Sequence, residues 1–220
     1  MLEGYTHILF NCFRSDLATT AEAARAVLSS PPPMQFTETR ETLNLGEIYS
    51  REPPRGGRHA KKVLFFSPLN CPASTVMFAN LSDGWHTLAN CMSKLIESRF
   101  YCFQLSFDGC EWPRNLFEVW DSGRITRHVS TIKDNDRWKF YQQGPIFPEE
   151  EEEQYAKRRV AQRLSTNYLI TVAGRLGFRI DEDQFWKSSS HAAYFRCGDP
   201  SENAMLAESE MDPDLRPLGS

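Results

Sequence analysis

The chain has 220 residues, of which 40% are hydrophobic and 25% charged, and its formal net charge is −4. This composition is typical of a globular protein, and the length suffices for one large domain or two small ones that share a core. No apolar run approaches the roughly 20 residues that a membrane helix needs, which argues against a membrane-spanning protein.

The negative charge is concentrated at the C-terminal end. Residues 198–220 contain six acidic residues and one basic residue, whereas residues 1–197 contain 24 basic and 23 acidic residues. A nearly neutral body does not indicate direct binding to nucleic acid. The first residues lack a basic segment followed by a long apolar one, so we expect no secretory signal, a cytoplasmic location and no membrane partner.

The first half of the chain predicts strands around one helix. Residues 7–13 read as a short buried strand, and Ser15 or Asp16 can cap a helix over the alanine-rich residues 17–29. Three prolines, at positions 31–33, end that helix. Alternating residues 36–49 predict a hairpin with its turn at 44–46, and a basic loop follows at 51–59.

The middle of the chain repeats this pattern. Apolar strands are predicted at 63–67 and 75–79, and Ser82 or Asp83 can cap the next helix, whose apolar residues recur every three or four positions. Further strands are predicted at 100–107, 116–120, 124–132 and 138–141. The order of strand, helix and strands in residues 7–50 and 75–132 indicates an internal β-α-β-β repeat.

We therefore predict an α+β protein with a mostly antiparallel sheet, helices packed on one face and a C-terminal helical pair at 149–163 and 166–176. Residues 1–187 are expected to form a single domain. Residues 188–220 contain a serine run followed by acidic and proline residues, which predicts a flexible acidic tail.

The cysteines and histidines form no recognisable ligand motif. The six cysteines show no CxxC pair, and the five histidines are scattered along the sequence. We expect reduced structural thiols, no zinc site and no cofactor.

Three alternatives involve chemistry or nucleic acid. Cys71 with His86 as its base would suit a small cytoplasmic hydrolase or transferase, although no local motif links the two residues. The carboxylates Asp108, Glu111 and Glu118 would flank a cleft for acid–base catalysis. The basic loop at 51–62 would contact phosphates in a nucleic-acid accessory protein. In each case a structural role or a position on the solvated surface explains the residues more simply, so we do not expect the protein to be an enzyme.

Two surface features favour protein binding instead. Glu149 to Glu153 place five carboxylates at the start of a predicted helix, where they either face solvent or dock in a basic cleft of a partner. Trp112 lies in a loop between two predicted strands, and tryptophan is enriched at binding hot spots.

Several motifs resemble those of small bacterial proteins encoded beside secreted toxins. The resemblance covers roughly residues 75–186 and rests on Asp83-Gly84-Trp85-His86-Thr87-Leu88-Ala89-Asn90, Glu111-Trp112-Pro113-Arg114-Asn115, Phe117-Glu118, Asp136-Arg137-Trp138-Lys139-Phe140 and Leu176-Gly177-Phe178. Members of this group are immunity proteins of contact-dependent or type VI secretion systems, which bind a cognate toxin and block its active site.

The resemblance implies that this protein inhibits a cognate toxin by direct binding. If the toxin is a nuclease, carboxylates would occupy the place of phosphates in its basic cleft. We predict that the partner-binding residues are Asp108, Glu111, Trp112, Asp134, Asp136, Glu149, Glu150, Glu151, Glu152 and Glu153.

Overall fold

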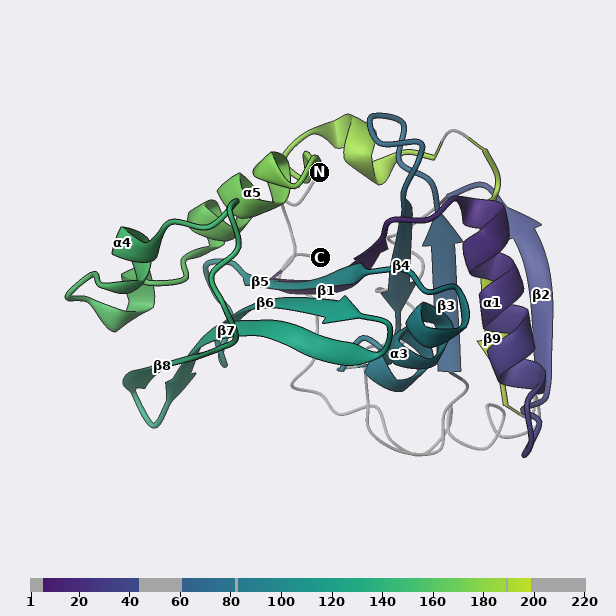
Figure 1. The fold of residues 1–220 in the computed structure, drawn as a ribbon, viewed down its shortest axis with the longest axis horizontal. Coiled ribbons are helices and arrows are strands. Elements are labelled where there is room, and N and C mark those ends of the chain that lie inside the picture. Colours follow the sequence, from purple (N-terminus) through teal and green to yellow (C-terminus); the bar gives the residue numbers. More distant parts are fainter. Residues whose placement is uncertain (1–5, 44–60, 82, 189, 199–220) are drawn as a thin grey trace, which may run out of the picture.

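A computed structural model of the chain describes residues 6–43, 61–81, 83–188 and 190–198. Its centre is a nine-stranded antiparallel sheet with the strand order β2-β9-β3-β4-β1-β5-β6-β7-β8 (Figure 1). The strands are β1 (His7–Phe13), β2 (Phe36–Glu41), β3 (Lys61–Phe66), β4 (Thr75–Ala79), β5 (Phe100–Ser106), β6 (Arg114–Asp121), β7 (Arg124–Asp134), β8 (Arg137–Gln143) and β9 (Ala192–Cys197). The predicted α+β class with an antiparallel sheet is confirmed.

Two helical crossovers build the middle of the sheet. Helix α1 (Leu17–Ser29) follows β1, and helix α3 (His86–Leu95) links β4 to β5, which lie on either side of β1. The elements β1-α1-β3-β4-α3-β5 therefore form a β-α-β-β-α-β unit with the strand order β3-β4-β1-β5. The first half of the expected repeat is completed by β3, because β2 lies at the far edge of the sheet and pairs with β9. The second strand of the hairpin predicted at 36–49 falls outside the described residues.

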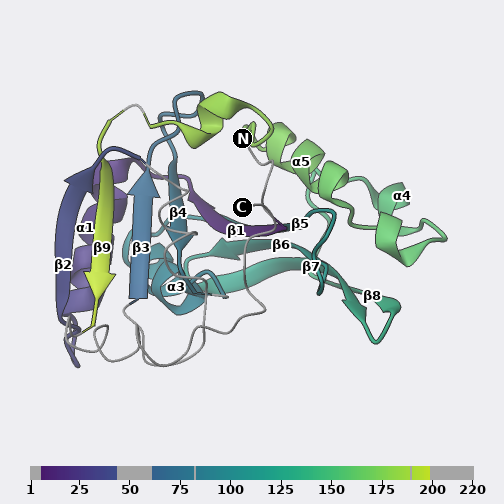
Figure 2. The same ribbon diagram turned by 180° about the vertical axis from the view of Figure 1, so that it is seen from behind.

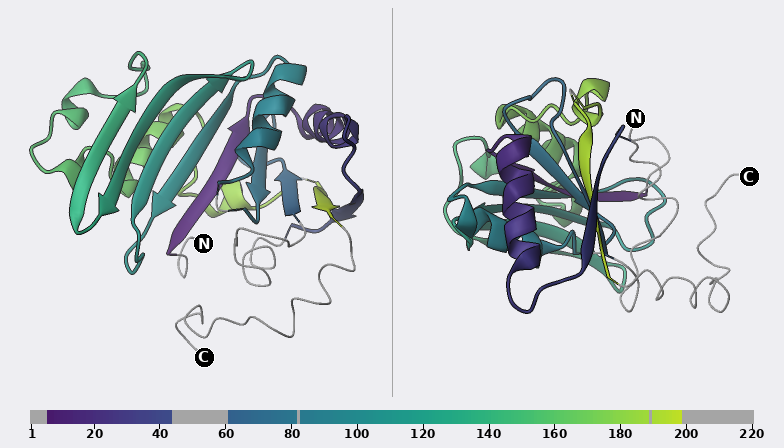
Figure 3. Two further views of the ribbon diagram at one scale, coloured as in Figure 1. Left: turned by 90° about the horizontal axis from the view of Figure 1, so that it is seen from below. Right: turned by 90° about the vertical axis from the view of Figure 1, so that its right-hand side faces the viewer.

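Helices cover both faces of the sheet, whereas the sequence suggested one. Helices α1 and α3 pack on the face that presents Phe65, Met77 and Cys102. Helix α5 (Thr166–Arg175) and the 3₁₀ turn η2 (Asp183–Trp186) cover the opposite face, which presents Phe10, Phe103 and Phe117. Figure 3 (left) shows α3 in front of the strands and the C-terminal helices behind them. The central strands are apolar on both sides, so each side needs a covering layer.

The sheet continues past the predicted domain boundary at residue 187. Strand β9 lies between β2 and β3 and pairs with both of them (Figure 2). Its residues Ala193, Phe195 and Cys197 are buried in the core. This short apolar run is enough to hold β9 in the sheet, although its neighbours in sequence are polar. Of the tail predicted at 188–220, residues 199–220 lie outside the described part of the chain.

The predicted C-terminal helical pair is only partly present. Helix α5 forms as expected, with the Ser165 side chain accepting a hydrogen bond from the Tyr168 backbone amide at 3.3 Å. The helix predicted at 149–163 is instead a short helix α4 (Glu152–Tyr155) and a separate 3₁₀ turn η1 (Val160–Gln162). No helix in the described part of the chain has the length and apolar character needed to span a bilayer.

Candidate functional site

A row of polar side chains crosses five neighbouring strands on the sheet face that carries α3. The strand registers align Asn11 with Cys102, Cys102 with Glu118, Glu118 with His128, and His128 with Gln143. Directly paired residues in an antiparallel sheet lie on the same face. Polar groups from distant parts of the chain are thus neighbours beside the apolar core.

A tight turn brings His86 to this row. Gly84 and Trp85, just before α3, both adopt positive φ angles, of 64° and 54°. An added Cβ at Gly84 would approach Leu9 Cδ2 to 1.9 Å, and together with the positive φ this close packing of the turn on β1 favours glycine. The Asn11 side-chain amide also donates a hydrogen bond to the Gly84 carbonyl at 3.2 Å. These contacts place His86, the first residue of α3, over the strands.

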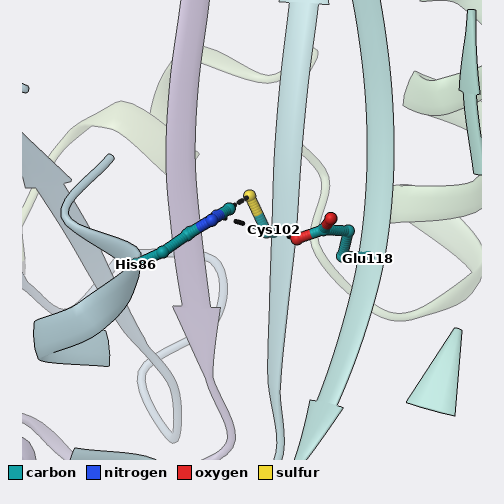
Figure 4. Close-up of side chains that lie close together, drawn as sticks. All are labelled: His86, Cys102 and Glu118. Atoms are coloured by element: carbon teal, nitrogen blue, oxygen red, sulfur yellow. Dashed lines mark hydrogen bonds and ion pairs between the residues drawn. The ribbon is translucent and has the colours of Figure 1, made fainter. Parts of the chain in front are cut away.

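His86, Cys102 and Glu118 converge in this place (Figure 4). His86 Nε2 lies 3.1 Å from Cys102 Sγ and 3.7 Å from Glu118 Oε2. Cys102 is fully buried, the Glu118 side chain is 8% exposed and the His86 side chain is 27% exposed. The cluster therefore has a closed side within the core and an open side at His86.

Glu118 is held from two further directions. His128 Nδ1 donates to Glu118 Oε1 at 2.8 Å, since a carboxylate can only accept, and Trp120 Nε1 donates to Glu118 Oε2 at 3.0 Å. Burial raises the pKa of Glu118, but the hydrogen bonds from His128 and Trp120, together with the nearby imidazoles, outweigh it and lower the pKa below its usual value. Glu118 is thus a well-oriented anion inside the sheet.

The Cys102 thiol is poorly suited to nucleophilic catalysis. Burial raises its pKa well above the ordinary value, and the adjacent Glu118 carboxylate raises it further. A reactive cysteine needs the opposite environment, one that stabilises the thiolate. The chemistry that the three groups share is the capacity to donate nitrogen, sulfur and oxygen ligands toward one point.

A groove of about 580 Å³ opens beside the cluster. Its walls come from β6, β7 and β8, and they comprise Arg114, His128, Ser130, Ile132, Tyr141, Gln142 and Gln143. His128 belongs to both features, because Nε2 lies 3.0 Å from Ser130 Oγ while Nδ1 bonds Glu118. The groove and the polar row therefore share His128 and Gln143.

Five of the predicted binding residues gather at one end of the sheet. Asp108, Glu111 and Trp112 lie in the β5–β6 loop, and Asp134 and Asp136 flank the β7–β8 turn. The Lys133 amide donates to the Pro113 carbonyl at 3.0 Å, which joins the two loops. Trp112 is 68% exposed. These five residues therefore share one end of the sheet, which we name the loop-end surface: Asp108, Glu111, Trp112, Asp134 and Asp136.

Glu150, the second residue of the predicted run from Glu149 to Glu153, lies away from this surface. Glu150 is buried and accepts hydrogen bonds from Arg127, which lies seven residues, or roughly 23 Å of strand, from Asp134. Glu149 is partly buried, and only Glu151, Glu152 and Glu153 are exposed. The sequence predicts that the whole run either faces solvent or docks on a partner, but its second carboxylate does neither and neutralises a buried arginine.

The catalytic alternatives do not form the arrangements they would need. Cys71 packs against the core on the α5 face, whereas His86 lies on the α3 face, so the sheet separates them. Asp108 lies in a loop, whereas Glu118 pairs with Cys102, roughly 14 Å of strand before the end of β5. The basic loop at 51–62 lies outside the described residues except for Lys61 and Lys62, the first residues of β3.

Sequence reasoning overlooked the convergence of His86 with Cys102 and the role of His128. It treated the scattered histidines as a reason to expect no metal ligands, yet the fold brings two of them to one carboxylate. A usable signal was present, because Glu118 is a charged residue inside the apolar strand β6. Comparisons with protein-family models, curated proteins and solved structures found no match to this chain.

Proposed function

We propose that this protein binds a secreted bacterial toxin inside the cell and blocks its active site, as an immunity protein does. The observation that carries the proposal is the exposure of Trp112, 68% of whose surface faces solvent in a loop beside acidic groups. Exposed tryptophan at a polar surface is the composition expected of a protein-binding hot spot. The motifs around Trp112 are also among those that resemble the immunity group.

The charges of the loop-end surface support a basic partner. Asp136 is 95% exposed and lies 3.0 Å from Lys133, while Asp134 pairs with Lys139, so the β7–β8 turn is close to neutral. Asp108 and Glu111 are exposed in the neighbouring loop, where no ion pair is formed with another described residue. These two carboxylates can face a phosphate-binding cleft of a nuclease toxin, where charge complementarity speeds association.

The partner is to be sought among the proteins encoded next to this one in its host. The full-length protein is used as bait for the neighbouring open reading frame, expressed as an inactive variant, and inhibition is measured on the active toxin. Trp112→Ala is compared with Leu95→Ala, which removes another exposed hydrophobic side chain, at the end of α3.

We expect Trp112→Ala to weaken inhibition by about 30-fold or more, as hot-spot truncations do, while Leu95→Ala inhibits like the wild type. Equal inhibition by both variants would move the interface away from Trp112. Failure of the wild-type protein to bind or inhibit the neighbouring gene product would remove the immunity function itself.

A second comparison tests whether the partner faces Asp108 and Glu111 or the exposed carboxylates of α4. Asp108→Lys with Glu111→Lys should slow association at low ionic strength, and the effect should shrink as salt is added. Glu152→Lys with Glu153→Lys makes the same charge change at a different place and should leave the association rate unchanged. Glu150 is excluded from this series because its carboxylate is buried against Arg127.

A further inference from the structure

We propose that His86, Cys102 and Glu118 bind one divalent transition-metal ion of the zinc class. The three donor atoms come from α3, β5 and β6 and lie within 4.8 Å of one another. This inference is independent of toxin binding, because none of the three residues belongs to the loop-end surface.

The distances from His86 to the other two donors are close to those around a tetrahedral ion. With a Zn–S bond near 2.3 Å and a Zn–N bond near 2.0 Å, the sulfur and nitrogen on one ion lie roughly 3.5 Å apart. The distance from His86 Nε2 is 3.1 Å to Cys102 Sγ and 3.7 Å to Glu118 Oε2. All three donor atoms lie within 4.8 Å of one another, so the site closes on one ion when the ligand side chains rotate toward a common point.

The ligand types select the metal. A thiolate and an imidazole favour borderline and soft ions such as Zn²⁺ and Co²⁺ over Mg²⁺ and Ca²⁺, which prefer sites made entirely of oxygen. Coordination releases the Cys102 thiol proton to solvent, so the bound site carries two anionic ligands and one neutral imidazole against a doubly charged ion. The buried charges are thereby balanced.

Surrounding groups orient the ligands. Glu118 is fixed by His128 at 2.8 Å and by Trp120 at 3.0 Å, and His128 is itself within 3.0 Å of Ser130 Oγ. Metal sites depend on such outer hydrogen bonds for their geometry. The close packing of Gly84 on Leu9 fixes the turn that leads into His86.

Three protein ligands leave one coordination position open. The His86 side chain is 27% exposed, so the open position lies on the solvent side of the cluster. Sites that use three ligands and one exchangeable position bind a water or a small anion there, whereas structural zinc sites use four protein ligands. We therefore assign an accessible site to this ion and not a closed structural one.

The test uses full-length protein stripped with a chelator and titrated with ZnCl₂ against a chromophoric competitor. We expect one Zn²⁺ per chain with a Kd below about 1 µM at neutral pH. Titration with CoCl₂ should give the intense near-ultraviolet absorption of a thiolate–cobalt bond. Binding weaker than this, or binding without the thiolate band, would overturn the assignment.

Variants identify the ligands. Cys102→Ala should abolish the thiolate–cobalt band, and His86→Ala and Glu118→Gln should each weaken Zn²⁺ binding by more than about tenfold. Cys12→Ala is the matched control, because Cys12 is an equally buried thiol whose side chain faces the other side of the sheet. His191→Ala removes an exposed histidine outside the cluster and should bind like the wild type.

A variant of His128 distinguishes a residue that orients a metal ligand from one that binds the ion itself. Because His128 contacts Glu118 and not the proposed ion position, His128→Gln should weaken Zn²⁺ binding about tenfold but keep the thiolate–cobalt band. If Cys102→Ala does not fold by circular dichroism, the wild type still decides the question. Its melting temperature must rise with Zn²⁺ and not with Mg²⁺, and an equal response to both ions contradicts the site.

Discussion

Arg127 and Glu150 form an ion pair that is almost completely removed from solvent. Their side chains are 1% and 0% exposed, and Arg127 Nη2 lies 2.9 Å from Glu150 Oε2. Arg127 also donates to the Gly144 carbonyl at 2.9 Å, and the Tyr155 hydroxyl donates to Glu150. The pair therefore joins β7 to the segment that carries α4, and every charged atom has a partner nearby.

Breaking this pair should destabilise the protein far more than removing an exposed carboxylate nearby. Glu150→Ala leaves a buried guanidinium without its counter-ion, for which the expected loss of unfolding free energy is about 3–5 kcal/mol. Urea unfolding monitored by circular dichroism measures the change. Glu152→Ala, two residues away on the exposed start of α4, should stay within about 0.5 kcal/mol of the wild type. Equal effects at both positions would contradict the burial of Glu150.

Two glycines should respond in opposite directions to substitution by alanine. Gly144 has a φ of 84°, and an added Cβ would lie 2.1 Å from the Thr126 carbonyl oxygen, so Gly144→Ala should cost about 2–3 kcal/mol. Gly174 lies within α5 with nothing within 4 Å of an added Cβ, so Gly174→Ala should stabilise by about 0.5–1 kcal/mol. Midpoints of urea unfolding measure both changes. A higher stability of Gly144→Ala would contradict the positive φ and the close contact with Thr126 described for Gly144.

Asp16 caps the first helix, and its contribution should depend on pH. Its carboxylate accepts from the Thr19 amide at 2.9 Å, and this hydrogen bond lowers the pKa of Asp16 below its ordinary value. A lowered folded-state pKa means that the stabilisation is present above the ordinary value of 3.8 and is lost as the pH falls through the folded-state pKa.

Replacing the cap tests this directly. Asp16→Ala should cost about 1 kcal/mol of unfolding free energy at pH 7, and the difference from the wild type should shrink toward pH 3. Ser15→Ala serves as the control, because Asp16 and not Ser15 supplies the cap. A difference that does not change with pH would show that the carboxylate charge plays no part.

The cysteines should react in the order of their exposure. Cys91 lies exposed on α3, whereas Cys12 and Cys102 are fully buried with their pKa values raised by burial, and burial raises the pKa of Cys197 to about 11. Alkylation of chelator-treated native protein at pH 8, followed by mass spectrometry, should label Cys91 first. Cys91→Ser should remove the fast phase, and early labelling of Cys12 would contradict the fold.

Local signals accounted for many of the elements. The alternation in β7 and β8 and the alanine-rich sequence of α1 identify these elements correctly, since each signal depends on neighbours in sequence. The prediction of helices on one face only is wrong, and the sequence already contained a signal against it. All five residues of β4 are buried, and a strand without a polar side must be covered twice. Strand β9 was missed because six residues beside a polar tail carry too weak a pattern.

The polar cluster could not be derived from spacing. Cys102 follows His86 by 16 residues, and Glu118 follows Cys102 by another 16, so no short motif contains two of them. Their meeting depends on the register that aligns Cys102 with Glu118 and on the Gly84 turn that sets the start of α3. The loop-end surface was more accessible to sequence reasoning, because loops that join adjacent strands of a meander share an end of the sheet.

The insertion of β9 between β2 and β3 has a consequence for biogenesis. Among the described strands, β2 has only β9 as a neighbour, and β9 ends at Cys197. While the ribosome is still adding residues after α5, the outer edge of β3 remains exposed as an unpaired template. This part of the sheet therefore cannot be completed until β9 has been synthesised, and nascent chains stalled before residue 192 should be the species that chaperones retain.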